Sequence, residues 1–435
     1  MLSQVLIALL AGWQADPIAR QAVAEIQARR YADAVNLLQQ NLAKQPHDAE
    51  LLNLLGIADS ELGRMADAQQ AFARGLSIAP DSISLNENAG LLYFREGRYA
   101  EAKKLLAHAV ALGSKSAGVR FSLAASKLRT GEVDAALMEL RELEPALQNV
   151  SDYWEERGRA ELPHLPADAE NSFERALQLR PESIVALNGA AAAAERQGLE
   201  EKALAYMIRA RKAAPDDVET LLHFAAVCIR RDLGPDAIEA AERARSLAPE
   251  NLSALYLLAR ANISVQNWQR ARDLFKQLSE KRPPFAPAFY ALGWLDLKLG
   301  RVSDARRELE HSLALDPKQT DARCDLAQLE LDDGNLDKAR SLLEAVLRES
   351  PTHAKANMML GDIELRAGRL DRARELLEKA VANDPKLSAA HYKLATIYAR
   401  ERENQKAAHE RALAAELSEE EKKQAHTQLR LVLPD

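Results

Sequence analysis

Apolar residues recur along this chain at helical spacing, in stretches of about a dozen residues separated by short polar turns. Between residues 289 and 299 they follow the three- and four-residue intervals of one helix face, and Gly300 then supplies a residue that is free to adopt positive φ. A second stripe runs through Ala305 and Leu309 before Pro317 ends it. The pattern predicts a helix, a turn, a second helix and a stop.

This unit is repeated along the chain with a period of about 34 residues. An alanine marks each copy, only Gly or Ala stands about twelve positions before it, and proline closes nine of the copies. Because one unit buries too little apolar surface to be stable alone, the copies are expected to stack on one another. The marking residues, with one residue lost after the fourth, are Ala34, Ala68, Ala102, Ala136, Ala169, Ala203, Ala237, Ala271, Ala305, Ala339, Ala373 and Ala407.

Several units match the pattern of one known repeat. The best matches are Leu52, Leu55, Gly56, Ala68, Phe72 and Pro80 in one unit, and Phe289, Leu292, Gly293, Ala305, Leu309 and Pro317 in another. On these residues the chain resembles the tetratricopeptide repeat (TPR) family over about residues 15–419. The resemblance implies an all-α, right-handed superhelical solenoid of about twelve tandem helix-turn-helix repeats, whose first helices line a concave groove that holds peptides or protein segments.

Irregularities divide the chain after residue 15 into four predicted parts. Residues 16–149 form an N-terminal TPR block, residues 150–182 an irregular repeat and residues 183–417 a C-terminal block. In the irregular repeat the usual glycine turn is replaced by residues 162–166, which predicts either a bend between the blocks or only a shortened turn. Ser418 and Glu421 have capping-box spacing, which predicts a separate C-terminal capping helix over residues 418–435.

Residues 1–15 precede the repeats and contain a short apolar run over residues 5–11. Its length is typical of a secretory signal peptide, although no Lys or Arg precedes it and Trp13 is bulky for a cleavage site. The alternative is an N-terminal cap on the first repeat. A cleaved signal predicts a periplasmic or secreted protein, whereas an intact Met1 predicts a cytoplasmic one, and N-terminal sequencing of the mature protein distinguishes them.

Composition argues against several functions. The net charge of −7 is unfavourable for a general nucleic-acid binder, and no run approaches the ~20 apolar residues that span a bilayer. The nine histidines are scattered without metal-ligand spacing, and no phosphate-binding loop occurs, so neither an enzyme nor a cofactor or metal site is expected. Cys228 and Cys324 lie three repeats apart in first helices, which argues against a disulfide.

The expected groove supplies the candidate site. Its fifth and ninth first-helix positions carry aromatic, flexible apolar and arginine side chains, which are typical of protein-binding hot spots. The alternative is that these side chains only fill the inside of the array. The candidates are Leu222, Tyr256, Tyr290, Cys324, Met358 and Tyr392 at the fifth position and Arg260 and Trp294 at the ninth.

Basic residues recur at the thirteenth position and predict a basic rim. They include Arg196, Arg230, Lys298, Arg366 and Arg400. Such a row would attract an acidic segment or a C-terminal carboxylate, although cations are also favoured at any helix C-terminus. The sequence therefore predicts a non-enzymatic scaffold for a protein or peptide of acidic character. The alternative is a substrate-recruiting or targeting subunit of a bacterial envelope enzyme or assembly complex.

Overall fold

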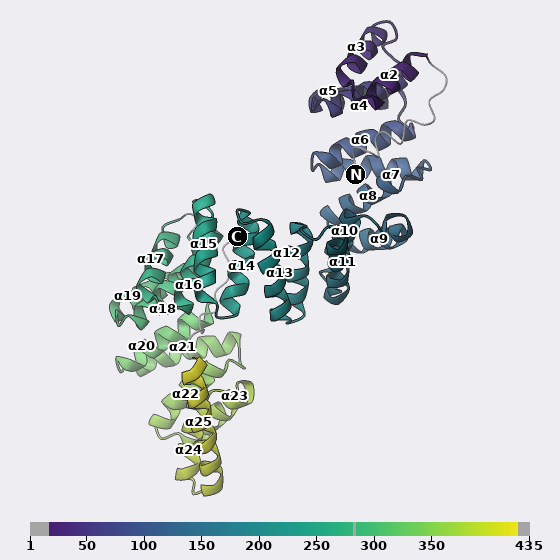
Figure 1. Ribbon diagram of the computed structural model, residues 1–435. Coiled ribbons are helices and arrows are strands. Elements are labelled where there is room, and N and C mark those ends of the chain that lie inside the picture. Colours follow the sequence, from purple (N-terminus) through teal and green to yellow (C-terminus); the bar gives the residue numbers. More distant parts are fainter. Residues whose placement is uncertain (1–16, 282–283, 425–435) are drawn as a thin grey trace. The chain divides into compact units, whose positions relative to one another are not determined.

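The computed structural model describes residues 17–281 and 284–424, which form 24 helices arranged as paired first and second helices of twelve repeats (Figure 1). The predicted all-α repeat architecture is therefore confirmed. The chain divides into two compact units, Met1–Ala213 and Ala214–Asp435, which are described separately. Residues 1–15 lie outside the described residues, so the signal-peptide and cap interpretations both stay predictions.

Each unit contains six helix pairs. In the first unit they are α2 (Pro17–Gln27), α3 (Tyr31–Leu42), α4 (Ala49–Glu61), α5 (Met65–Ile78), α6 (Ile83–Arg95), α7 (Tyr99–Ala111), α8 (Ala117–Arg129), α9 (Val133–Leu147), α10 (Ser151–Glu161), α11 (Pro166–Leu179), α12 (Ile184–Arg196) and α13 (Glu200–Ala213). In the second unit they are α14 (Val218–Arg230), α15 (Gly234–Leu247), α16 (Leu252–Ser264), α17 (Trp268–Ser279), α18 (Ala286–Lys298), α19 (Val302–Leu315), α20 (Thr320–Asp332), α21 (Leu336–Glu349), α22 (Ala354–Arg366), α23 (Leu370–Asn383), α24 (Ser388–Arg400) and α25 (Asn404–Gln424).

Local chemistry fixes where the helices begin and turn. Asp48 caps α4, because its Oδ1 accepts hydrogen bonds from the backbone N–H groups of Glu50 and Leu51 at 2.9 and 3.0 Å. The turn inside every pair except the irregular α10–α11 contains a left-handed residue, and Gly300 is an example with φ of 72°. Four turns use a residue other than glycine at the equivalent place, namely Arg29, Asp232, Gln266 and Arg402.

A side-chain N–H near the start of four first helices donates to the backbone carbonyl oxygen six residues earlier. This bond satisfies a carbonyl where one repeat ends and the next begins, which proline alone cannot do. The sequence indicated the closing prolines but not these donors. The bonds are Asn86 to Pro80 at 2.7 Å, Trp154 to Gln148 at 2.8 Å, Asn357 to Pro351 at 3.0 Å and His391 to Pro385 at 2.9 Å.

Small residues bring the two helices of a pair together, as the sequence predicted. A Cβ atom added to Gly293 would lie 2.7 Å from Leu309 Cγ, closer than packed side chains approach. Phe173 packs between two glycines, because a Cβ atom at Gly158 would lie 2.9 Å from its ring and one at Gly189 would lie 2.4 Å from it. Gly158 belongs to the same repeat as Phe173 and Gly189 to the next, so this ring joins two repeats.

Substituting Gly189→Ala is expected to destabilise the first unit by ~1–3 kcal/mol. Phe173 is buried and cannot retreat from the added methyl group without meeting Gly158. The better helix propensity of alanine, ~1 kcal/mol, is too small to offset the clash fully. Urea unfolding followed by circular dichroism measures the change. Combining Gly189→Ala with Phe173→Leu should recover stability, and a Gly189→Ala variant as stable as wild type would contradict the packing.

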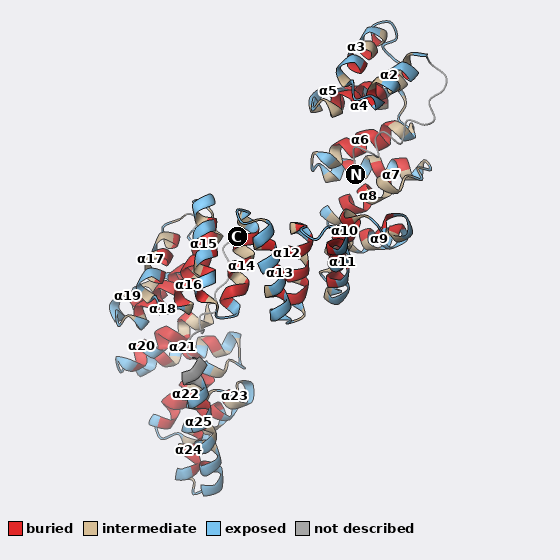
Figure 2. Ribbon diagram, viewed as in Figure 1, coloured by how far each residue is buried: buried red, intermediate tan, exposed pale blue. Residues whose placement is uncertain are grey.

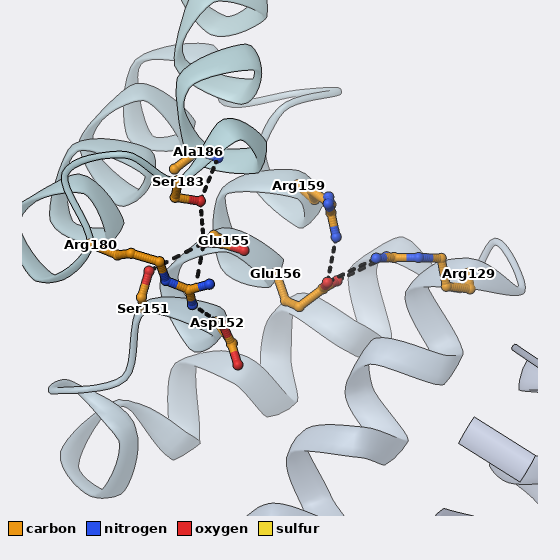
Figure 3. Close-up of polar contacts among 9 residues, drawn as sticks. All are labelled: Arg129, Ser151, Asp152, Glu155, Glu156, Arg159, Arg180, Ser183 and Ala186. Atoms are coloured by element: carbon orange, nitrogen blue, oxygen red, sulfur yellow. Dashed lines mark hydrogen bonds and ion pairs between the residues drawn. The ribbon is translucent and has the colours of Figure 1, made fainter. Parts of the chain in front are cut away.

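The irregular repeat, α10 and α11, is tied to both of its neighbours (Figure 3). Arg129 on α8 donates two hydrogen bonds of 2.8 Å to Glu156, and Ser183 before α12 donates one of 2.7 Å to Glu155. The repeat therefore lies inside the first unit, whose last helix is α13, and the predicted block boundary at residues 150–182 is not where the chain divides. The bend stays a prediction.

The C-terminal capping helix was predicted wrongly as a separate element. Helix α25 runs from Asn404 through Ser418 to Gln424 without interruption. This stretch contains no glycine or proline, and its alanine, glutamate, lysine and leucine residues favour helix continuation over a new start at Ser418. Residues 425–435 lie outside the described residues.

Candidate protein-binding face

First helices are buried on most sides, and a few positions reach solvent. Figure 2 shows long buried stretches along α16 and α18, whereas second helices such as α15 keep one exposed side. In the second unit the predicted groove residues that reach solvent are Leu222, Arg260, Trp294, Met358 and Tyr392. We call these five residues the candidate face.

Trp294 is the best-defined aromatic side chain of the candidate face. It lies on α18 and is half-buried, with its ring edge-on to Trp268 at 5.8 Å between centroids. The ammonium group of Lys298, one helical turn later, lies 5.1 Å from the centre of the Trp294 ring. These contacts hold the indole in place while part of it stays open to solvent, which is the arrangement expected of a preorganised anchor.

Tyr256 does not belong to this exposed set. Its side chain is 0% exposed and packs edge-on against Phe275 and Phe285, with ring centroids 6.0 and 6.5 Å away. Burial raises the pKa of its hydroxyl to about 12 although the nearby Arg260 guanidinium opposes the rise, and the hydroxyl oxygen is buried without a direct hydrogen bond to a described residue. This burial favours the packing interpretation for Tyr256, and ligand contact by this residue stays a prediction.

Tyr290 and Cys324 are also buried, at 7% and 0% exposure. Burial raises the pKa of the Tyr290 hydroxyl, and the nearby carboxylate of Asp325 raises it further. The thiol of Cys324 has a pKa raised to about 12 by burial, so it is not a reactive nucleophile. Their burial favours the packing alternative for both residues. Cys228 is buried too, and neither cysteine forms a disulfide within the described residues.

Two aspartates of the first helices, Asp325 and Asp362, form ion pairs that the sequence did not indicate. Asp325 accepts a hydrogen bond of 2.7 Å from Lys355 Nζ. Asp325 lies beside both Tyr290 and Cys324, and Lys355 lies beside Cys324. Asp362 on α22 binds Lys393 of the next repeat at 2.5 Å. The partners come from different repeats and do not stand at equivalent repeat positions, so spacing alone could not pair them.

The predicted basic rim is not one row of available cations. Arg366 Nη2 lies 2.8 Å from Asp362 and is therefore already neutralised. Lys298 is exposed over Trp294, and Arg400 is exposed at the end of α24 without a partner among the described residues. Arg230 is exposed at the end of α14 in the same unit. Arg196 belongs to the first unit, where its guanidinium donates weakly to the Pro163 carbonyl at 3.4 Å.

The described part of the chain carries no cluster of three or more His, Cys, Asp or Glu side chains placed to hold a metal ion. Across these same residues, none of the helices combines the length and the apolar character needed to cross a membrane. What the structure does present is a series of helix pairs with a mixed apolar and charged face. This architecture is that of a helical-repeat scaffold protein.

The sequence matches the tetratricopeptide repeat family at residues 25–86, 93–159, 164–218, 234–295, 290–354, 324–388 and 358–421. Because these matches cover well over half of the chain, the protein belongs to the tetratricopeptide repeat family. Members of this family typically mediate protein–protein interactions. No curated protein matches the chain in a sequence search.

Solved structures with a similar arrangement are distant. The yeast Tom70 structure is 17% identical with a TM-score of 0.46, and the match covers 94% of this chain and 93% of that one. The Cut9–Hcn1 hetero-tetramer of APC/C is 13% identical with a TM-score of 0.46, covering 95% and 96%. YrrB, described as a TPR protein with an unusual peptide-binding site, is 18% identical with a TM-score of 0.38, covering 42% and 95%. At these values the likeness says nothing about this protein's ligand.

Proposed function

We propose that this protein is a non-enzymatic scaffold that binds a peptide or protein segment on the candidate face of residues 214–435. Trp294 carries the proposal. It is the partly exposed tryptophan of the face, and contacts with Trp268 and Lys298 already restrict its side chain. Tryptophan in such a setting contributes large contact area for little loss of conformational entropy, which is why it is enriched in interface hot spots.

Two cations of the second unit, Arg260 and Lys298, favour a ligand of acidic character. Arg260 is partly exposed on α16, with its guanidinium carbon 6.0 Å from the ring of Tyr256, and Lys298 is exposed on α18. Neither cation forms an ion pair with a described residue. An acidic ligand segment lying across α16 and α18 would meet both cations beside Trp294, which adds orientation to the apolar contact.

Selection from a random peptide library displayed on phage, with the full chain as bait, tests the proposal. Synthetic versions of the enriched peptides are expected to bind the wild-type chain and to lose about 30-fold in affinity to a Trp294→Ala variant, as hot-spot truncation does. Their sequences should be enriched in Asp and Glu. Fluorescence anisotropy with labelled peptides measures the affinities.

The matched control is Val302→Ala on the second helix α19, where valine is 48% exposed outside the candidate face. It should bind the selected peptides as wild type does. Equal binding of the peptides to wild type and Trp294→Ala would exclude this face as the binding site. A selected peptide that matches a segment of an enzyme subunit would instead favour the substrate-recruiting alternative.

A further inference from the structure

The last repeat has an open pocket between its two helices, α24 and α25. The pocket has a volume of about 380 Å³ and opens beside Tyr392, whose side chain is 63% exposed. Of the residues that line the pocket, Tyr392 alone belongs to the candidate face. The lining residues are Ser388, Ala389, Tyr392, Lys393, Arg411, Ala414, Ala415 and Ser418.

Earlier repeats use the same surface to pack against the next repeat. The counterparts of Tyr392, Arg411, Ala414 and Ala415 in the preceding repeat are Met358, Leu377, Ala380 and Val381. These four join an apolar cluster with Ala390, Leu394 and Ile397 of α24, which is the first helix of the following repeat. The pocket is therefore the place where the first helix of a further repeat would pack.

Arg411 changes the chemistry of this surface. Its counterparts in the other repeats are apolar and buried, from Leu38 and Phe72 to Leu343 and Leu377. Arg411 itself is exposed, and it forms no hydrogen bond or ion pair with any described residue. Lys393, the other cation of the pocket, is already bound to Asp362 at 2.5 Å. The pocket thus combines small apolar residues and an open tyrosine with one unpaired guanidinium.

We propose that this pocket binds an acidic amphipathic helix of a partner protein, which packs where the first helix of a further repeat would lie. The apolar stripe of that helix covers Tyr392, Ala414 and Ala415, and one of its carboxylates pairs with Arg411. Helix-in-groove recognition of this kind uses anchors at i and i+4, as Ala390 and Leu394 do on the preceding repeat.

The repeats also show which residue of the incoming helix faces Arg411. In the irregular repeat the equivalent residue is Phe173, and it touches Gly189 on the first helix of the next repeat. The residue of α24 that corresponds to Gly189 is Lys393. A helix that resembles α24 but carries glutamate at that position would place its carboxylate opposite Arg411.

Two labelled peptides of residues 387–401 test the proposal, one with the natural sequence and one with Lys393→Glu. The full chain is expected to bind the Lys393→Glu peptide about fivefold more tightly in fluorescence anisotropy, because one partly exposed charge pair is worth up to ~1 kcal/mol. An Arg411→Glu variant of the full chain should reverse the preference. A Tyr392→Ala variant should weaken binding of both peptides, which places them in the pocket.

Because Arg411 is exposed, the Arg411→Glu variant is expected to keep the wild-type melting curve, and Val302→Ala serves as a binding control. Equal binding of the two peptides, or no binding of either, would overturn the proposal. A chain ending at Gln424 that binds the peptides when the full chain does not would show that residues 425–435 occupy the pocket, and this outcome also overturns binding of a partner helix.

Discussion

Substituting Arg272→Met is expected to destabilise the second unit by about 3–5 kcal/mol, because it leaves a buried carboxylate without its main partner. Asp296 on α18 is 0% exposed, and Arg272 of the preceding repeat holds it with Nε–Oδ1 and Nη2–Oδ2 contacts of 2.5 and 3.2 Å. Arg301 Nη1 lies 4.0 Å from the same carboxylate and is expected to compensate weakly, which places the loss toward the lower end of that range.

Replacing both charged residues by apolar ones separates two effects, which are the cost of burying an unpaired carboxylate and the attraction between the two charges. The double variant Arg272→Met/Asp296→Leu should recover most of the lost stability, since buried ion pairs can be exchanged for apolar side chains of similar volume. The matched control is Arg307→Met, because Arg307 is 65% exposed and its pair with Asp304 should contribute no more than ~1 kcal/mol. Urea unfolding followed by circular dichroism, together with hydrogen exchange of α17 and α18, measures these changes.

An Arg272→Met variant no less stable than Arg307→Met would show that the pair contributes nothing beyond a surface contact. The same pairing recurs at the equivalent positions of the next two repeats, where Arg306 pairs with Glu330 and Arg340 with Glu364. If the mechanism is right, these two positions should respond in the same direction. Glu330 is 8% exposed and Glu364 is 3% exposed, so we expect smaller losses of stability there than at Asp296, which is fully buried.

Tyr256→Ala is expected to lower the free energy of unfolding of the second unit by about 3–5 kcal/mol, whereas Tyr256→Phe should be neutral or slightly stabilising. The ring fills space between Phe275 and Phe285, so removing it leaves a cavity in the core of the second unit. The hydroxyl is buried without a well-directed hydrogen bond, so its removal relieves a desolvation penalty. The two variants compared by urea unfolding separate the contribution of the ring from that of the hydroxyl.

The same pair of variants checks the assignment of Tyr256 to the core. Tyr256→Phe should bind the selected peptides as wild type does, because no ligand reaches a side chain that is 0% exposed. Loss of binding in a stably folded Tyr256→Phe variant would mean that the hydroxyl becomes accessible when a ligand binds. Trp294→Ala, in contrast, should lose binding with a smaller loss of stability, since its ring is only half-buried.

The local features of the fold were predictable because they depend on neighbours in the sequence. Helical periodicity, glycine or a tolerant residue in each turn, and proline between units specify a helix pair within a single repeat. Gly293 against Leu309 was predictable for the same reason, since both residues belong to one unit. The exceptions are also local. Ser418 has the spacing of a helix start, but no helix-breaking residue precedes it within α25, so the helix continues.

The candidate site was predictable only in part. The fifth first-helix position holds both Tyr256 and Tyr392, which are identical in type and equivalent in register, yet one is 0% and the other 63% exposed. Their exposure depends on what the next repeat places above them. Phe285, at the start of the next first helix, packs on Tyr256, whereas Tyr392 belongs to the last repeat and opens into a pocket.

By itself the sequence determined that this protein is a stack of tetratricopeptide repeats, because the repeat period encodes each helix pair and the small residues that join it. The tertiary structure decided which side chains are paired, buried or exposed. It paired Arg272 with Asp296 and Arg366 with Asp362, buried Tyr256, and left Trp294 and Arg411 open. Burial and charge pairing arise between neighbouring repeats, where the size and reach of each side chain, rather than its position in the period, determine the contacts.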